Sequence, residues 1–130
     1  MIEIVFPTSL GEWLAWLTAL ASILVGLCLM LMPRGFMRFI GFGDSADNEG
    51  AVAEIRGPFG GVYFGFGIAA ILLAQPLIYI ALGFGFLGAV IGRLLGFLTD
   101  RTFTPKILAA TFLEVLGAFF PLAYAFGLIG

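Results

Sequence analysis

Apolar residues gather along the chain into four long stretches, separated by short breaks that are rich in proline and polar residues. A helix needs about 20 predominantly apolar residues to cross the hydrocarbon core of a bilayer. The pattern predicts four such helices, over about residues 10–32, 50–75, 77–98 and 105–128. The second and third are separated by Gln75 and Pro76 alone, so we expect a tight hairpin there. The chain is therefore expected to be all-α, an integral membrane four-helix bundle with antiparallel neighbours in a single transmembrane domain over residues 1–130.

Residues at the breaks carry the usual signals for helix ends. Pro33 ends the first helix, and Pro105 suits the first turn of the fourth. Asp47, Asn48 and Glu49 precede the second apolar stretch. We expect them to cap the start of that helix and to complement its dipole.

The composition supports a membrane protein and excludes several other classes. Hydrophobic residues make up 62% of the chain and charged residues 11%, against about 25% charged in soluble domains. The absence of histidine and the single cysteine, Cys28, exclude an intrachain disulfide and a Cys/His metal cluster. A net charge of −2 gives no nucleic-acid footprint. We therefore expect no metal, no cofactor and no nucleic-acid partner.

The charges predict the orientation of the helices. Four spans place both termini on one side, and that side carries Glu3 and Glu12 but no basic residue. The positive-inside rule then makes the opposite end cytoplasmic. We expect a multi-pass protein of the bacterial inner membrane with both termini outside, and a basic and aromatic segment at 33–43 on the inner leaflet. All six basic residues belong to the cytoplasmic half: Arg34, Arg38, Arg56, Arg93, Arg101 and Lys106.

Four charged residues fall inside the predicted spans, where each costs about 2.5–3.5 kcal/mol on insertion scales. They are Glu54, Arg56, Arg93 and Glu114. A rise of 1.5 Å per residue places Arg93 and Glu114 about 9 and 13 Å below the same membrane face, so they can form a bidentate pair. Glu54 is expected beside Arg93 or Arg34, and Arg56 beside Glu114 or Asp100. The resulting cluster of four is either a register lock or a site for an anionic or amphiphilic headgroup or a proton-coupled acid.

Glycines at four-residue spacing form a second pattern, typical of a glycine zipper. They are Gly88, Gly92 and Gly96 in the third helix and Gly61 and Gly65 in the second. Such stripes let helix backbones approach closely in lipid. We predict that these five glycines pack helices together, either within the bundle or at a seam with a partner helix or a second copy.

Several of these residues together resemble a known family. The pattern runs from Glu54-Ile-Arg56-Gly57-Pro-Phe-Gly60-Gly61 through Gly92-Arg93-Leu-Leu, Asp100 and Pro105 to Glu114. It is similar to that of a bacterial family of four-helix membrane proteins of unknown function. The resemblance covers about residues 15–128, and it implies the fold but no activity.

Two functions remain open from the sequence. The first is a non-enzymatic accessory or structural subunit that packs against other membrane proteins or against itself. The alternative is a small carrier or binding protein for a lipid-like, quinone or other amphiphilic ligand, with the cluster of four charges as its site. An enzyme is not expected, because the chain offers no histidine base, no nucleophile with a paired base and no metal set.

Overall fold

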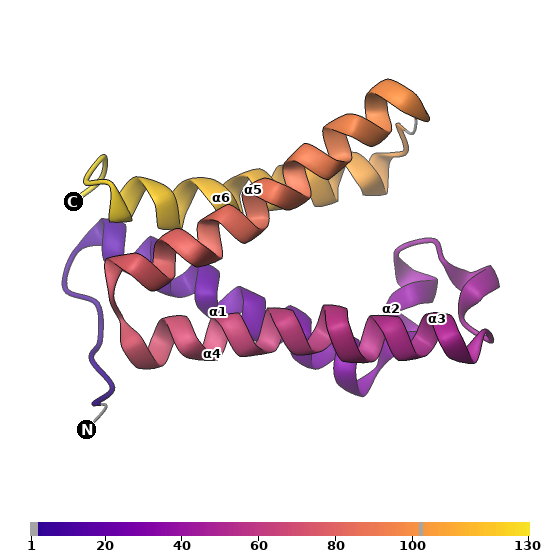
Figure 1. The fold of residues 1–130 in the computed structure, drawn as a ribbon, viewed down its shortest axis with the longest axis horizontal. Coiled ribbons are helices and arrows are strands. Elements are labelled where there is room, and N and C mark those ends of the chain that lie inside the picture. Colours follow the sequence, from indigo (N-terminus) through magenta and orange to yellow (C-terminus); the bar gives the residue numbers. More distant parts are fainter. Residues whose placement is uncertain (1–2, 102) are drawn as a thin grey trace. The chain divides into compact units, whose positions relative to one another are not determined.

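The structure, a computed structural model, describes residues 3–101 and 103–130. These residues form helices and short turns, and none of them lies in a β-strand (Figure 1). The helices are α1 (Leu10–Leu31), α2 (Pro33–Phe39), α3 (Glu49–Glu54), α4 (Gly61–Leu73), α5 (Pro76–Thr99) and α6 (Pro105–Ala125).

Within the described residues, four segments are long and apolar enough to cross a membrane: Leu10–Leu31, Glu49–Leu73, Pro76–Thr99 and Pro105–Ala125. Their ends lie close to those predicted from the sequence, and the protein is a multi-pass membrane protein. Many large hydrophobic side chains along these helices are exposed, as expected where lipid is the solvent.

The start signals of two helices act as the sequence predicts. The side chain of Asn48 accepts a hydrogen bond from the backbone N–H of Ala51 at 3.1 Å, which caps α3. Pro105 occupies the first turn of α6, and the hydroxyl of Thr104 caps that helix by accepting from the N–H of Ile107 at 3.3 Å. Each cap satisfies one of the backbone donors that a helix start leaves without an intrahelical partner.

The second span contains an irregularity that the sequence analysis did not anticipate. Between α3 and α4 the backbone forms a π-helical turn, η2 (Ile55–Gly60), with Pro58 inside it. Proline has no N–H, and its ring clashes with the carbonyl of the preceding turn of an α-helix. The wider π-helical turn accommodates that ring, so the span continues through the proline as a helix of changed geometry.

The chain divides into two compact units. One comprises residues 19–69, and the other comprises the described parts of residues 1–18 and 70–130. Helices α1 and α4 each contribute to both units. The single transmembrane domain therefore stays a prediction.

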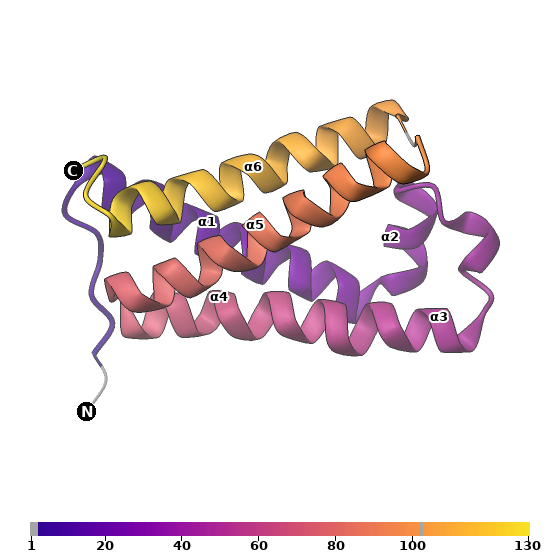
Figure 2. The ribbon, with the colours of Figure 1, turned by 45° about the horizontal axis from the view of Figure 1, so that its top comes forward.

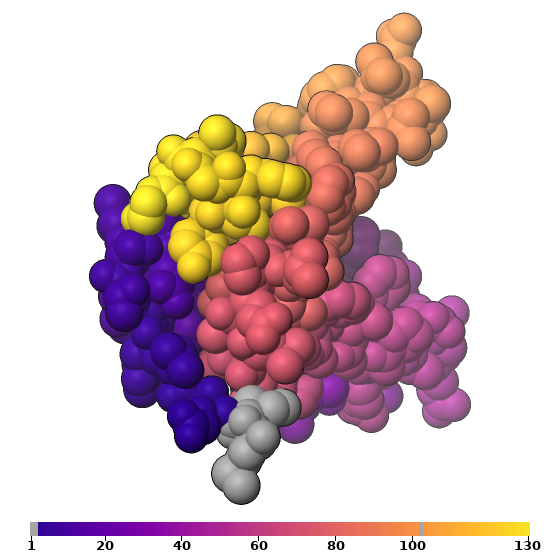
Figure 3. All heavy atoms as spheres, turned by 60° about the vertical axis from the view of Figure 1, so that its left-hand side comes forward, coloured from indigo at the N-terminus to yellow at the C-terminus, as the bar shows by residue number. Residues whose placement is uncertain are grey.

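In the unit that contains both chain ends, α5 and α6 form an antiparallel hairpin (Figure 2). Gly83 of α5 faces Leu122 of α6, and Phe86 faces Gly117. Residues with higher numbers in α5 thus face residues with lower numbers in α6, as in an antiparallel pair. The C-terminal turn returns to the start of α1, where the carbonyl of Gly130 accepts from the N–H of Gly11 at 3.0 Å (Figure 3).

In the unit of residues 19–69, α1 packs closely against η2 and α4. A Cβ atom added at Gly26 would lie 2.7 Å from the carbonyl oxygen of Gly60, and one added at Gly67 would lie 2.7 Å from that of Ala19. The hydroxyl of Ser22 donates to the carbonyl of Tyr63 at 2.7 Å. Small residues thus bring the backbones together, and one interhelical hydrogen bond adds to the contact.

The segment predicted for the inner leaflet forms α2 and a short 3₁₀ turn, η1 (Gly43–Ser45). Met37 is buried against Ala46 and Val52, while Phe39 and Phe42 are exposed. The segment therefore has one face packed on α3 and another that carries exposed aromatic side chains. Its place on the inner leaflet stays a prediction.

Candidate functional site

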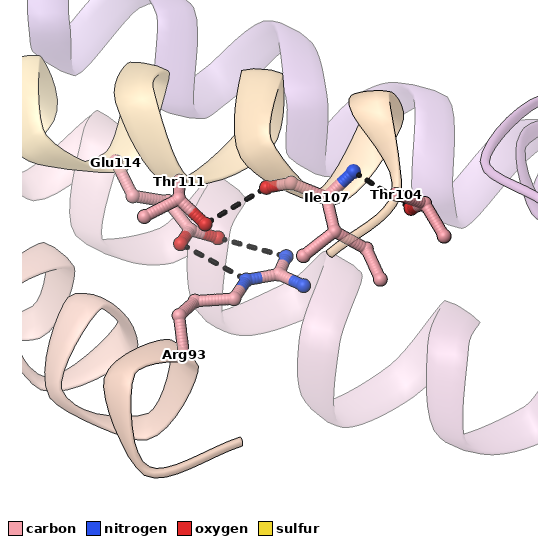
Figure 4. A network of polar contacts seen from close by, with 5 residues as sticks. All are labelled: Arg93, Thr104, Ile107, Thr111 and Glu114. Atoms are coloured by element: carbon pink, nitrogen blue, oxygen red, sulfur yellow. Dashed lines mark hydrogen bonds and ion pairs between the residues drawn. The ribbon is translucent and has the colours of Figure 1, made fainter. Parts of the chain in front are cut away.

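The most prominent charged contact in the spans joins α5 to α6. The guanidinium of Arg93 donates to both carboxylate oxygens of Glu114, from Nε to Oε2 at 3.2 Å and from Nη2 to Oε1 at 3.1 Å (Figure 4). The side chains are 36% and 12% exposed, respectively. The structure therefore brings these two residues together in the bidentate arrangement expected from their depths. Two parallel bonds fix the rotation of one helix relative to the other as well as neutralising both charges.

The polar groups around the pair are engaged elsewhere. The hydroxyl of Thr111, one turn before Glu114 on α6, donates to the carbonyl of Ile107 at 2.8 Å and not to the carboxylate (Figure 4). The guanidinium atom Nη1 of Arg93 makes no hydrogen bond within the part of the chain that the structure describes. Both carboxylate oxygens of Glu114 are thus occupied by Arg93, whereas the arginine has one donor without a partner among the described residues.

Arg56 takes a different partner from those expected. Its Nε donates to the backbone carbonyl of Met30 at 3.1 Å, within the unit of residues 19–69. Met30 lies in the last turn of α1, where carbonyls lack intrahelical donors and a cation is favoured by the helix dipole. Arg56 therefore caps the C-terminal end of α1. The sequence had suggested an acidic partner for it, Glu114 or Asp100.

Glu54, the fourth predicted member, is exposed at the end of α3 and forms no ion pair with any residue that the structure describes. The structure thus joins Arg93 to Glu114 in one unit and places Glu54 and Arg56 in the other. The wider cluster of four stays a prediction.

The five glycines of the predicted stripes have open surroundings. A Cβ atom added at Gly61, Gly65, Gly88, Gly92 or Gly96 would meet no atom of the same unit within 4 Å. Close helix contacts form instead at other glycines, namely Gly26, Gly60 and Gly67 in one unit and Gly83 and Gly117 in the other. The packing role of the stripes stays a prediction that requires a partner from outside their own unit.

The sequence does carry a signal for the contact that forms on α1. Ala15, Ala19, Ser22 and Gly26 follow one another at intervals of four, three and four residues, and all four are buried. This spacing places small residues on one face of a helix. Glycine spacing alone does not reveal this stripe, because alanine and serine form most of it.

An apolar groove of about 350 Å³ runs along the α5–α6 hairpin. Val90 at one end lies one turn from Arg93, and Val115 is adjacent to Glu114. The groove contains almost no polar surface, so it suits a hydrocarbon chain and not a polar substrate. Its walls are formed by Leu87, Val90, Val115, Ala118, Phe119, Leu122, Ala123, Phe126 and Leu128.

Metal binding has no support in the side-chain arrangement. Within residues 3–101 and 103–130, no three His, Cys, Asp or Glu side chains lie close enough together to hold a metal ion. The polar chemistry of the spans is instead that of paired charges and backbone caps.

Comparison with known proteins identifies a family. No curated protein and no solved structure matches the chain. The profile of the DUF4345 family, described as a domain of unknown function, matches residues 10–126. This range covers all four membrane-spanning segments, including the paired Arg93 and Glu114. The chain belongs to the DUF4345 family.

Proposed function

We propose that this protein is a non-enzymatic structural subunit of the bacterial inner membrane that packs through α5 against a second copy of itself. The basic residues lie toward one end of the spans, which supports an orientation with that end in the cytoplasm and both termini outside. A helix of a larger membrane complex is the alternative partner for the same surface.

The observation that carries the proposal is the open glycine face of α5. Gly88, Gly92 and Gly96 recur every four residues, and a Cβ atom added at any of them would meet no atom of its unit within 4 Å. A glycine in a helix interior costs roughly 0.5–1 kcal/mol relative to alanine. A stripe of three glycines is therefore expected where the close approach of another membrane helix offsets this destabilisation.

The test is a bulky substitution at the centre of the stripe. Gly92→Leu blocks close approach by a partner helix, while a Cβ atom at this position meets no atom of its own unit within 4 Å, so we expect the hairpin to fold. The matched control is Ala109→Leu, which adds bulk at an exposed position of α6. Native mass spectrometry of the protein in mild detergent gives the number of copies per particle.

We expect the wild type and Ala109→Leu to be oligomeric and Gly92→Leu to be monomeric with unchanged helix content by circular dichroism. An oligomer of unchanged size in Gly92→Leu would contradict the proposal. If a different protein co-purifies stoichiometrically with the wild type but not with Gly92→Leu, the partner of this face is a subunit of another complex and not a second copy.

The state of the carboxylates supports a non-enzymatic role. Both oxygens of Glu114 accept hydrogen bonds from Arg93, so both are already engaged. A general base must reach a substrate proton at hydrogen-bonding distance. Since the chain contains no histidine, an acid within the spans would be the candidate for that task, and Glu114 is already engaged by Arg93.

The apolar groove favours a second candidate, a binding protein for an amphiphile. Arg93 retains a free donor beside one end of the groove, which suits an anionic or carbonyl headgroup above a hydrocarbon tail. Val115→Trp would fill the groove, and Leu113→Trp places the same side chain at an exposed position outside its lining. Native mass spectrometry should show a retained lipid or quinone in the wild type and Leu113→Trp but not in Val115→Trp. An identical lipid content in all three would exclude this role.

A further inference from the structure

The connection between the first two membrane-spanning segments carries a short helix at the membrane surface. The first span ends at Leu31, the second begins at Glu49, and α2 starts at Pro33, two residues after the first span. These residues all belong to the unit of residues 19–69. The seven residues of α2 form a helix about 10 Å long, so α2 stays within reach of the lipid headgroups around the end of α1.

One face of α2 is packed against the protein. Pro33 and Met37, four residues apart, are buried, and Met37 lies in a small core with Ala46 and Val52 of the same unit. Residues at this spacing share one side of a helix. A step of two residues turns a helix by about 200°, so Phe39 lies on the side opposite Met37, away from this core.

The end of α2 is equally well defined. Gly41 has a φ of 99°, in the left-handed region that glycine adopts without strain. The N–H of Phe42 donates to the carbonyl of Met37 at 2.6 Å, and the N–H of Gly41 donates to the carbonyl of Arg38 at 3.3 Å. These two bonds form the Schellman motif that ends many helices. The outer side chains are therefore presented by a helix with a defined end.

The outer side of this helix combines basic and aromatic side chains. Arg34 and Arg38 are exposed and lie one turn apart. Phe39 is 72% exposed, and Phe42, just beyond the helix, is 54% exposed. No acidic residue occurs among residues 33–43. Apolar side chains flanked by basic ones are typical of helices that lie in the interface of a bilayer.

The charge of the two arginines is only weakly compensated within the protein. Arg38 approaches Asp47 at 3.9 Å, and both side chains are largely exposed, at 57% and 93%. An exposed pair contributes little to stability. Arg34 forms no ion pair with the residues that the structure describes. Both guanidinium groups are therefore available to a phosphate, which each can bind through two N–H donors.

We propose that the outer side of α2, with Arg34, Arg38 and Phe39, is a docking surface for anionic phospholipids of the leaflet in which α1 ends. The arginines bind the lipid phosphates, and the rings of Phe39 and Phe42 enter the boundary between headgroups and acyl chains. Anionic lipids are preferred over zwitterionic ones, because a negative surface potential attracts each basic residue near it. This surface is separate from the glycine face of α5 and does not depend on the structural role of that helix.

Native mass spectrometry of the full chain in mild detergent measures the preference directly. The protein is titrated with phosphatidylglycerol or with phosphatidylcholine of the same acyl chains, and we expect the wild type to bind phosphatidylglycerol more tightly. Arg34→Gln and Arg38→Gln should each weaken phosphatidylglycerol binding about fivefold and leave phosphatidylcholine binding nearly unchanged. Phe39→Ser should instead weaken the binding of both lipids by the same factor, because burial of the ring does not depend on headgroup charge.

Arg101→Gln is the matched control, since Arg101 is an exposed arginine in another loop and in the other unit. It should leave the binding of both lipids unchanged. Asp47→Asn removes the acid that approaches Arg38 and should strengthen phosphatidylglycerol binding severalfold. The gain should be smaller in Asp44→Asn, because Asp44 forms no ion pair with any described residue. This comparison tests the surface even if an arginine variant fails to fold.

Equal affinities of the wild type for the two lipids would overturn the proposal. Equal losses in Arg38→Gln and Arg101→Gln would do the same, because the preference would then reflect net charge and not this surface. If a protein co-purifies with the wild type but not with Phe39→Ser, and neither lipid is preferred, the surface binds a protein partner and the lipid proposal is refuted.

Discussion

Two glycines of α4, two residues apart, are predicted to respond in opposite directions to the same substitution. Gly67 is buried, and a Cβ atom there would lie 2.7 Å from the carbonyl oxygen of Ala19 and 2.6 Å from a side-chain carbon of Ile23. Gly65 is exposed, and a Cβ atom there would meet nothing of its unit within 4 Å. Gly67→Ala and Gly65→Ala add the same methyl group to the same helix, so they form a matched pair.

The expected magnitudes follow from these distances. Replacing a mid-helix glycine by alanine stabilises a helix by roughly 0.5–1 kcal/mol, and Gly65→Ala should show this gain. At Gly67 the side chain of Ile23 can turn away, but the carbonyl of Ala19 belongs to the backbone of α1, so the helices must separate. Overpacking of this kind typically costs about 1–3 kcal/mol. The net effect of Gly67→Ala is a loss of about 1 kcal/mol, and the two variants should differ by about 2 kcal/mol.

The assay is equilibrium unfolding of the full chain in mixed micelles of a mild detergent and sodium dodecyl sulfate, followed by circular dichroism. A difference of 2 kcal/mol changes the ratio of folded to unfolded protein about 30-fold, which this assay resolves. If Gly67→Ala were as stable as Gly65→Ala, the close approach of α4 to α1 would be refuted. If Gly65→Ala were the more damaging variant, the exposed stripe would be the packed face instead.

Three further predictions concern the ion pair, a helix cap and the orientation. Glu114→Gln leaves Arg93 unpaired and should lower the free energy of unfolding by about 2 kcal/mol, a smaller loss than for a fully buried pair. Arg93→Gln should lower it by a similar amount. If the losses of the two single variants add up in the double variant, the two side chains are not energetically coupled. Asn48→Ala should cost about 1 kcal/mol and speed hydrogen exchange at the N–H of Ala51, and equal exchange in both proteins would show that this cap is not formed in solution. Alkaline phosphatase fused after residue 130 should be active in the periplasm, whereas an inactive fusion together with an active cytoplasmic reporter would reverse the orientation.

The helices were predictable from the sequence because the bilayer imposes a length on them. About 20 apolar residues are required per span, and Pro33, Gln75-Pro76 and Pro105 mark the breaks between the stretches. The π-helical turn at Pro58 was not predictable in the same way. Proline in a membrane helix permits several local adjustments, and the sequence does not show that Gly60, two residues later, packs against Met30.

The candidate site was predictable only where the depth of a charged residue in the membrane is enough to identify its ion-pair partner. Arg93 and Glu114 lie at similar distances from the loop that joins their helices, so the hairpin brings them together. Arg56 found the carbonyl of Met30, which no count of charged side chains could reveal. The hydroxyl of Tyr79 is buried and has no hydrogen-bond partner among the described residues, and this was equally hidden, because an unsatisfied donor is a property of three-dimensional burial and not of residue type.

The pairing of Arg93 with Glu114 also affects how the chain enters the bilayer during synthesis. A lone charged side chain near the centre of a helix raises the free energy of its insertion by about 2.5–3.5 kcal/mol. In the α5–α6 hairpin the two charges meet across a short connection between Thr99 and Pro105, and they can leave the translocon as a neutral pair. We therefore expect α5 to insert more readily once α6 has been made, with the two helices entering the bilayer together.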